Sequence, residues 1–260
     1  MAKILLIETS GPTLSVAIAD GGRVLAERVC NEPRMQASLT APLVKEVLDA
    51  LSLAVSDCDA VCVSKGPGSY TGLRVGVSTA KGLAFGASLP LIAIGTLDIL
   101  ACYGIQDTPA TGRGRKICGG PLTPEGPRSH ICGRGPDTLS RPLPLYVVPM
   151  IDARRMEVYT AVYNAAGERL TPIEAKVIGP DSFADELAAG PVLFIGDGAL
   201  KCKDVITHPN ARFREAYPLA SAMAPLAEAA YNKKQFEDLA YFEPFYLKEF
   251  VAALPKVHGL

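Results

Sequence analysis

Short apolar stretches separated by turn residues open the chain. Residues 3–8, 13–19 and 23–30 are apolar or alternate between apolar and polar side chains, and Gly, Pro and Asp occupy the turns between them. Alternation with a period of two is typical of strands, and such short turns join antiparallel neighbours. In the segment 36–53 the apolar residues instead recur every three or four positions. The sequence therefore predicts a three-stranded antiparallel meander followed by an amphipathic helix.

Strands and helices then alternate along the chain. Residues 60–64 form an apolar run, which is typical of a strand covered on both faces. The stretch GPGSYTGLR at 66–74 follows this run and leads into a helix that we expect to end near Gly86. A further apolar run at 91–95 predicts another strand. The predicted order of the first half is therefore three strands, helix, strand, helix, strand.

The second half of the chain repeats the beginning of this order. The pattern predicts strands within 144–152, 156–164 and 169–178, a helix at 181–189 and a strand at 191–196. Two copies of a strand-strand-strand-helix-strand unit indicate an α/β protein with a duplicated fold. We expect the actin-like, ribonuclease-H-like plan, in which two lobes with mixed sheets face each other.

These patterns set the expected domain boundaries. The first actin-like lobe is predicted at 1–103, and the second lobe at 143–260. The second lobe would include a closing helix from about Leu219 to Phe236, in which Pro225 can introduce a kink.

Residues 104–142 interrupt the duplicated pattern. They are rich in Gly, Pro and Arg, contain no aromatic residue and show little apolar periodicity, so we expect a flexible surface insertion. The segment is locally basic, and contact with RNA is the alternative to a solvated loop. Its Cys118, His130 and Cys132 lack a fourth ligand and the paired spacing of a zinc site, so no metal is expected there.

Composition narrows the class of protein. The chain has 260 residues, of which 48% are hydrophobic and 20% charged, so it can bury a large core. The formal net charge of -1 gives no general attraction to nucleic acid or to a membrane surface. Apolar stretches are shorter than the ~18 residues that span a bilayer, and Glu8 interrupts the apolar start of the chain. With seven cysteines, an odd number, we expect a cytoplasmic protein with reduced thiols.

The glycine-rich stretch at 66–74 resembles the start of a phosphate-binding loop. Pro67-Gly68 favours a tight turn, and Ser69 or Thr71 can cap the helix that follows, which leaves backbone N–H groups free to bind an anion. A GxxxxGK[ST] loop also needs a lysine beside the phosphates and a hydroxyl on magnesium, and neither stands at the corresponding positions. A strand-to-helix turn that needs small residues is therefore the favoured interpretation.

Small residues recur every four positions in the helix after this loop. Glycine inside a helix costs about 1 kcal/mol relative to alanine, so its repeated use calls for the close approach of another backbone. The approaching element is either the first helix of the same chain or a helix of a partner, and both can apply on different faces. The two rows are Gly72, Gly76, Ala80 and Ala84, and Ser78, Gly82 and Gly86.

Acidic residues test whether the chain is an ATPase. An actin-like ATPase usually keeps an Asp on its first strand to organise magnesium, but this chain has Glu8, whose longer side chain would displace the metal. Asp152 and Asp197 each follow a strand of the second half. An Asp-Gly pair after a strand is most often only a turn. The candidates for nucleotide binding are therefore weak, and they are Glu8, Ser69 and Asp197.

Histidines test whether the chain is a metallopeptidase. His130, His208 and His258 are far apart, and the sequence contains neither an HExxH nor an HxxxH pair, nor a GxSxG elbow. A helix-borne metal site is therefore not expected.

Several stretches of the chain together resemble the TsaB family, also called YeaZ. They are GPGSYTGLRVG with AKGLA behind it, the N-terminal LLIETS, IDARRMEVYTAVY, IGDGA and EPFYLKEF. The resemblance covers nearly the whole chain except 104–142, and GPGSYTGLR is its most diagnostic element. The family is the bacterial subunit of the machinery that places threonylcarbamoyl on adenosine 37 of tRNA.

The resemblance implies an actin-like fold that is degenerate relative to its catalytic partner TsaD, which holds the metal and nucleotide. In TsaD a pair of metal-binding histidines lies on the helix that corresponds to residues 36–40. This chain has Gln36 and Thr40 at these places. Many TsaB sequences have one His near position 36, and its absence here is a small departure from the family pattern.

The resemblance further implies the partners of the chain. It would pair with TsaD through helices of the first lobe, the pair would recruit the ATPase TsaE, and tRNA would be reached through the complex. The complex uses ATP, with metal and nucleotide on TsaD and TsaE, so this chain would bind no cofactor. Without TsaD, homodimers through the same surface are expected. The predicted partner-binding residues are Leu39, Leu43, Val47, Gly72, Arg74, Gly76 and Ala80.

The function expected from the sequence is a non-catalytic scaffold that activates TsaD. The main alternative is an independent actin-like kinase or ATPase that uses Glu8, the loop 66–72 and Asp197. A metallopeptidase is a third alternative, and the spacing of the histidines argues against it. The missing first-strand Asp and the missing lysine of the loop separate the first two hypotheses.

Overall fold

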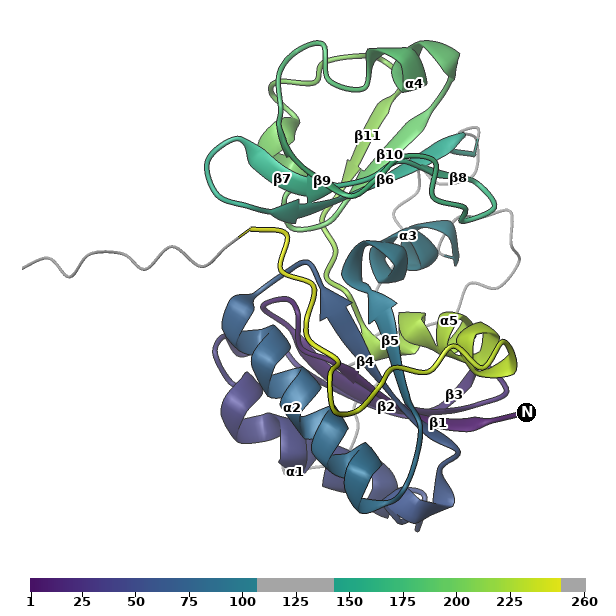
Figure 1. The fold of residues 1–260 in the computed structure, drawn as a ribbon. Helices are drawn as coiled ribbons and strands as arrows, with labels where there is room; N and C mark the ends of the chain where they lie inside the picture. The colour runs from purple at the N-terminus through teal and green to yellow at the C-terminus, as the bar shows by residue number, and fades with distance from the viewer. Residues whose placement is uncertain (107–142, 249–260) are drawn as a thin grey trace, which may run out of the picture.

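A computed structural model describes residues 1–106 and 143–248, which are arranged as two lobes (Figure 1). Residues of both lobes line a cleft between them. The first lobe begins with the predicted meander and ends with a helix at the boundary between the lobes. Its elements are β1 (Lys3–Glu8), β2 (Leu14–Asp20), β3 (Arg23–Cys30), α1 (Gln36–Asp49), η1 (Val55–Asp57), β4 (Ala60–Gly66), α2 (Tyr70–Gly86), β5 (Leu91–Gly95) and α3 (Thr96–Gln106).

The first sheet has the strand order β3-β2-β1-β4-β5. β1 pairs antiparallel with β2 and parallel with β4, because the chain reverses through a short turn after β1 but crosses over through α1 before β4. Side chains of β1 alternate between the faces: Leu5 and Ile7 join one core, and Ile4 and Leu6 join the other. The predicted strand covered on both faces, at 60–64, is confirmed as part of β4.

Helices cover both faces of this sheet. α1 and α2 pack on the side of Leu5 and Ile7, where Leu43 and Val47 of α1 are buried (Figure 1). The other side is covered by α3 and by the last of the described helices.

The second lobe repeats the topology of the first. Its sheet has the order β11-β10-β6-β7-β9, and β8 pairs with β6. β6 is antiparallel to β7 and parallel to β10, as β1 is to β2 and β4. The elements in this half of the chain are β6 (Tyr146–Asp152), β7 (Glu157–Thr160), β8 (Tyr163–Asn164), β9 (Glu174–Val177), α4 (Ala184–Ala189), β10 (Val192–Ile195), η3 (Leu200–Cys202), β11 (Ala211–Arg214) and, outside the second lobe, α5 (Ala220–Asn232).

The duplication confirms the predicted fold class, but the domain boundaries need correction. Helix α5 was expected in the second lobe, yet it packs on β1, β2, β3 and β5 of the first sheet. Its small residues Ala220, Ala224 and Ala227 lie flat against that sheet, and the helix continues through Pro225. Helix α3 was not predicted, and it runs to Gln106, so the first three residues of the expected insertion are helical.

Parts of the second lobe also differ from the prediction. The strand expected at 156–164 is divided into β7 and β8, and β11 was not predicted. The insertion after residue 106, with Cys118, His130 and Cys132, lies outside the described residues.

Candidate functional site

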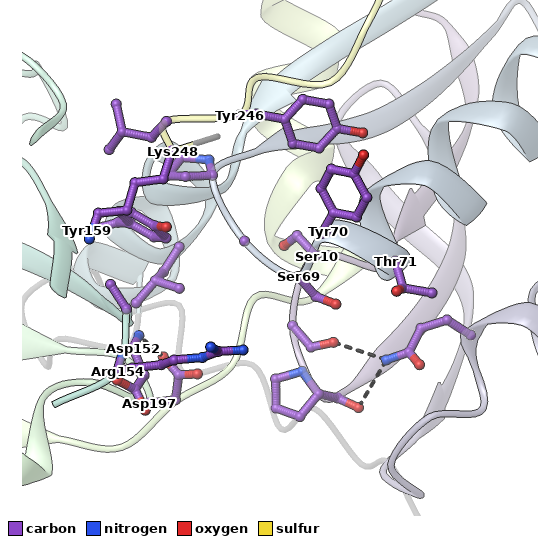
Figure 2. A pocket seen from close by; sticks show the side chains of 18 of the residues that line it. Ser10, Ser69, Tyr70, Thr71, Asp152, Arg154, Tyr159, Asp197, Tyr246 and Lys248 are labelled. Carbon is purple, nitrogen blue, oxygen red and sulfur yellow. Dashed lines mark hydrogen bonds between the residues drawn. The ribbon is translucent and has the colours of Figure 1, made fainter. Parts of the chain in front are cut away.

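The glycine-rich loop joins β4 to α2 at the edge of the cleft (Figure 2). Ser69 is the N-cap of α2, because its hydroxyl accepts a hydrogen bond from the Gly72 amide at 3.2 Å. The predicted capping role of Ser69 is therefore confirmed. The Ser69 amide in turn donates to the Ser10 carbonyl at 2.7 Å, which ties the loop to the end of β1.

The glycines of this loop are explained by close packing inside the lobe. A Cβ at Gly72 would lie 2.0 Å from the Thr9 carbonyl oxygen, and one at Gly76 would lie 2.1 Å from the Thr9 hydroxyl. At Gly68 a Cβ would lie 2.4 Å from the Ser10 carbonyl oxygen. The Thr9 hydroxyl also donates to the Gly72 carbonyl at 2.8 Å. The loop thus needs glycine to admit the backbone after β1, as a strand-to-helix turn would.

This packing corrects most of the predicted partner-binding residues. The first small-residue row faces the sheet, so its members cannot contact a partner without opening the lobe, and Leu43 and Val47 lie in the same core. Of the seven predicted partner-binding residues, only Arg74 is exposed, and Leu39 is half-buried. The buried members of the prediction are Leu43, Val47, Gly72, Gly76 and Ala80.

The second small-residue row lies on the opposite side of α2. Ser78, Gly82 and Gly86 are exposed, and a Cβ added at either glycine would meet nothing within 4 Å. Phe85 stands beside them with 79% of its surface exposed. Phe85 was not among the predicted partner-binding residues, although a large aromatic side chain outside the buried positions of the helix was an available signal. We use the name outer face for these exposed residues of α2, Arg74, Ser78, Gly82, Phe85 and Gly86, together with Ala37, Ala41 and Pro42, which are exposed on the neighbouring helix α1.

The interlobe cleft has a volume of about 940 Å³. Figure 2 shows Ser69, Tyr70 and Thr71 of the first lobe on one side and Asp152, Arg154 and Asp197 of the second lobe on the other. Tyr70 contacts Arg74, whose guanidinium carbon lies 4.4 Å from the centre of its ring. The weak nucleotide candidates Ser69 and Asp197 therefore share this cleft, but Ser69 is occupied as a cap.

Glu8, the third candidate, does not line the cleft. Its side chain is fully buried, and one carboxylate oxygen accepts both the amide and the hydroxyl of Ser10, at 2.6 and 2.5 Å. Burial raises the pKa of Glu8 to about 7, although the hydrogen bonds from Ser10 oppose this shift. Its other oxygen has no hydrogen-bond partner. An acid held in this way does not fit the magnesium-organising role of the first-strand Asp.

The two aspartates of the second lobe support each other. The Asp152 amide donates to the Asp197 carboxylate at 2.9 Å, and the Asp152 carboxylate accepts the Lys201 ammonium at 2.5 Å. Burial raises the pKa of Asp197. For Asp152, burial acts to raise the pKa, but the hydrogen bond from Lys201 and the nearby cations outweigh it, and the pKa is lowered. The Asp197 side chain thus joins the ends of β6 and β10, and the Asp152 side chain ties the end of β6 to η3.

Gln36 and Thr40, at the start of α1, both bind backbone carbonyls. The Gln36 side-chain amide donates to the Gly11 carbonyl at 3.0 Å, and the Thr40 hydroxyl donates to the Gln36 carbonyl at 2.5 Å. In residues 1–106 and 143–248, no group of three or more His, Cys, Asp or Glu side chains could hold a metal ion. Among the described helices, none has the length and apolarity that a membrane crossing requires.

Fold and cleft together define the chain as a two-lobe protein of the actin-like class, in which the acid at the end of β1 does not line the cleft. Comparison with known proteins supports this class. A structure titled "YeaZ from Pseudomonas aeruginosa" is similar with a TM-score of 0.71 and 26% identity, over 95% of this chain and 100% of that one. A TsaB protein of Bacillus subtilis is 30% identical over 78% of this chain and 74% of its own length. The chain therefore belongs to the TsaB family.

Further comparisons extend this result. A TsaB protein of Escherichia coli is 28% identical over 96% of both chains, and both TsaB relatives are named tRNA threonylcarbamoyladenosine biosynthesis proteins. Residues 33–112 also match the family described as "TsaD: tRNA N6-adenosine threonylcarbamoyltransferase". That segment contains α1, β4, α2, β5 and α3.

Proposed function

We propose that the chain is a non-catalytic scaffold subunit of tRNA threonylcarbamoyladenosine biosynthesis, which binds and activates a TsaD protein through the outer face of α1 and α2. Membership in the TsaB family supports the pathway. The match of residues 33–112 to the TsaD family supports the mode of pairing. Two related subunits that present the same helices to each other can form a pseudo-symmetric pair, as identical subunits do in a twofold dimer.

One observation carries this proposal: the exposed row of small residues on α2. Gly82 and Gly86 have no internal neighbour that would exclude a side chain, unlike Gly72 and Gly76. Glycine at an exposed helix position lowers stability by about 1 kcal/mol relative to alanine, without benefit to the isolated chain. Close approach of another helix is the physical use that remains. Phe85 beside this row supplies the large apolar anchor that interfaces favour.

The residues around the cleft support a complex in which other subunits hold the metal and the nucleotide. Glu8 is buried and engaged with Ser10, and the loop 66–72 is packed on the end of β1. We therefore assign the metal and nucleotide to TsaD, and ATP use to TsaD together with TsaE, with no cofactor on this chain. In this proposal TsaE and tRNA join through the complex in the cytoplasm, and without TsaD the outer face forms a homodimer.

The test places a bulky side chain on the outer face. We expect Gly82→Trp and Ser78→Trp to weaken binding to the TsaD of the same organism at least about tenfold, or about 1.4 kcal/mol. Calorimetric titration measures the affinity, and a threonylcarbamoylation assay on tRNA measures activation. Ala188→Trp on α4 is the matched control, since it adds the same side chain at an exposed helical site of the second lobe.

Two results would contradict the proposal. Unchanged affinity in both tryptophan variants, with an unchanged melting temperature, would place the interface elsewhere. Micromolar binding and turnover of Mg-ATP by the isolated chain would favour the independent ATPase instead.

A further inference from the structure

The segment after α5 lies along the flank of the first lobe and then turns toward the second (Figure 1, yellow). We call residues 237–248 the strap. The Glu237 amide donates to the Leu91 carbonyl at 2.8 Å, and the Lys81 ammonium donates to the Phe242 carbonyl at 3.0 Å. The strap is therefore fastened to β5 and to α2 along most of its length.

The end of the strap is seated against the glycine-rich loop. The Phe245 amide donates to the Lys65 carbonyl at 2.7 Å. Gly66 has a φ of +105°, and a Cβ there would lie 2.6 Å from the Phe245 carbonyl oxygen, so only glycine admits the strap. Tyr246 then packs on Tyr70, with ring centroids 4.8 Å apart. These contacts fix the strap at the start of α2, where Phe245 to Lys248 line the cleft (Figure 2).

The last described residue of the strap crosses to the second lobe. The Lys248 ammonium forms an ion pair with the Glu157 carboxylate at the start of β7. A second tie between the lobes lies at α3, where the Tyr163 hydroxyl donates to the Asp98 carboxylate at 2.7 Å. Neither Asp98 nor Tyr163 lines the cleft, whereas Lys248 does. The lobes are thus joined at α3, away from the cleft, and by the strap at the cleft itself.

We propose that the strap is a latch across the interlobe cleft. Tyr246 on Tyr70 anchors it to the first lobe, and the Lys248–Glu157 pair holds the second lobe at the present separation. Exposed ion pairs are weak and are screened by salt, and both members of this pair are partly exposed. Removal of either charge is therefore enough to open the latch. Its release lets the second lobe move about the contacts at α3 and widens the cleft.

The first test measures the separation of the lobes in the full-length chain. Ser56 and Asp185 are exposed on different lobes, and each is replaced by an amino acid with a keto group that carries a spin label. This chemistry leaves the native cysteines unlabelled. Pulsed electron resonance should give a narrow distance distribution for the parent chain. Lys248→Ala and Glu157→Gln should each broaden it and shift it to longer distances. The matched control is Lys176→Ala, which removes a surface ion pair with Glu174 inside the second lobe.

Three further variants separate opening of the latch from a general loosening of the fold. The charge exchange Lys248→Glu with Glu157→Lys should restore the narrow distribution. Tyr246→Ala should broaden it, whereas Tyr241→Ala, on a strap tyrosine that is 84% exposed, should not. A broad distribution in the parent chain would overturn the proposal. So would distributions that stay narrow in Lys248→Ala, Glu157→Gln and Tyr246→Ala, since folded chains with the tie removed would then keep the same separation.

Discussion

The two lobes place an acid at the same point of the same topology and treat it in opposite ways. Glu8 ends β1, and Asp152 ends β6, the strand that holds the corresponding place in the second sheet. Glu8 is buried and has a pKa raised to about 7, whereas Asp152 lines the cleft and has a lowered pKa. The duplicated sheet therefore fixes the position of the acid, but its neighbours decide whether it faces the cleft or the core.

Turns near the ends of β1 and β6 show a similar contrast. β4 pairs parallel with β1 and β10 pairs parallel with β6, and a glycine that follows each of them packs close to the neighbouring strand. Gly72 meets Thr9, just after β1, and Gly196 meets the carbonyl of Met150 in β6, 2.1 Å from where a Cβ would lie. In the first lobe the turn begins the long helix α2, and in the second it leads only to η3. The first lobe thus gains a helical outer surface.

The largest effect is expected from filling these close approaches. Gly72→Ala should lower the free energy of unfolding by about 3 kcal/mol or more, because its Cβ would overlap a backbone carbonyl that cannot rotate away. Gly196→Ala should cost at least as much, since φ there is +136°. Urea unfolding measures both. Urea midpoints close to those of the parent chain would show that the backbone at Thr9 or Met150 moves aside easily.

The next effect concerns the buried acid. The pKa of Glu8 rises from 4.5 to about 7 on folding, so its stabilising contribution is complete below pH 4.5 and is lost as the pH rises through about 7. Glu8→Gln keeps an acceptor for Ser10 but cannot ionise. It should raise the free energy of unfolding at pH 8 by about 3 kcal/mol and have little effect at pH 4.5. Equal urea midpoints of variant and parent at pH 8 would contradict this.

A smaller effect of opposite sign to Gly72→Ala is expected on the exposed side of α2. Gly82→Ala should raise the free energy of unfolding by about 0.5 to 1 kcal/mol, because alanine favours the helix and its methyl group meets nothing. Gly72→Ala and Gly82→Ala make the same chemical change in the same helix, so they compare its buried side with its exposed side. A loss of stability in this variant would mean that the outer face packs internally after all.

The smallest effect is expected at the exposed acid. Because the pKa of Asp152 is lowered on folding, its contribution to the free energy of unfolding is fully present above the unfolded pKa of about 3.8. That contribution is lost as the pH falls through the lowered pKa of the folded state. Its ion pair with Lys201 is partly exposed, so Asp152→Asn should cost at most about 1 kcal/mol at pH 7 and less at pH 3. Thermal unfolding at the two pH values checks this. A cost that grows on acidification would contradict it.

Sequence patterns predicted the duplication because β1, β4 and β6 carry strong apolar signals that do not depend on their neighbours. They missed α3, whose Leu97, Leu100 and Ala101 are buried between the lobes, so that it lacks one clear polar face. They also could not decide which small-residue row of α2 faced the sheet, because both rows have the same spacing. The contact of Gly72 with Thr9, 63 residues away, decides it, and periodicity carries no such information.

Helix α5 has a consequence for synthesis of the chain on the ribosome. The face of the first sheet formed by Ile4, Leu6 and Ile92 is closed in part by Ala220 and Met223, which are translated after the whole second lobe. N-terminal domains generally fold first as they emerge. Here the first lobe cannot complete its core until α5 has left the ribosome, after the second lobe. The nascent first lobe therefore exposes an apolar face of its sheet during most of translation.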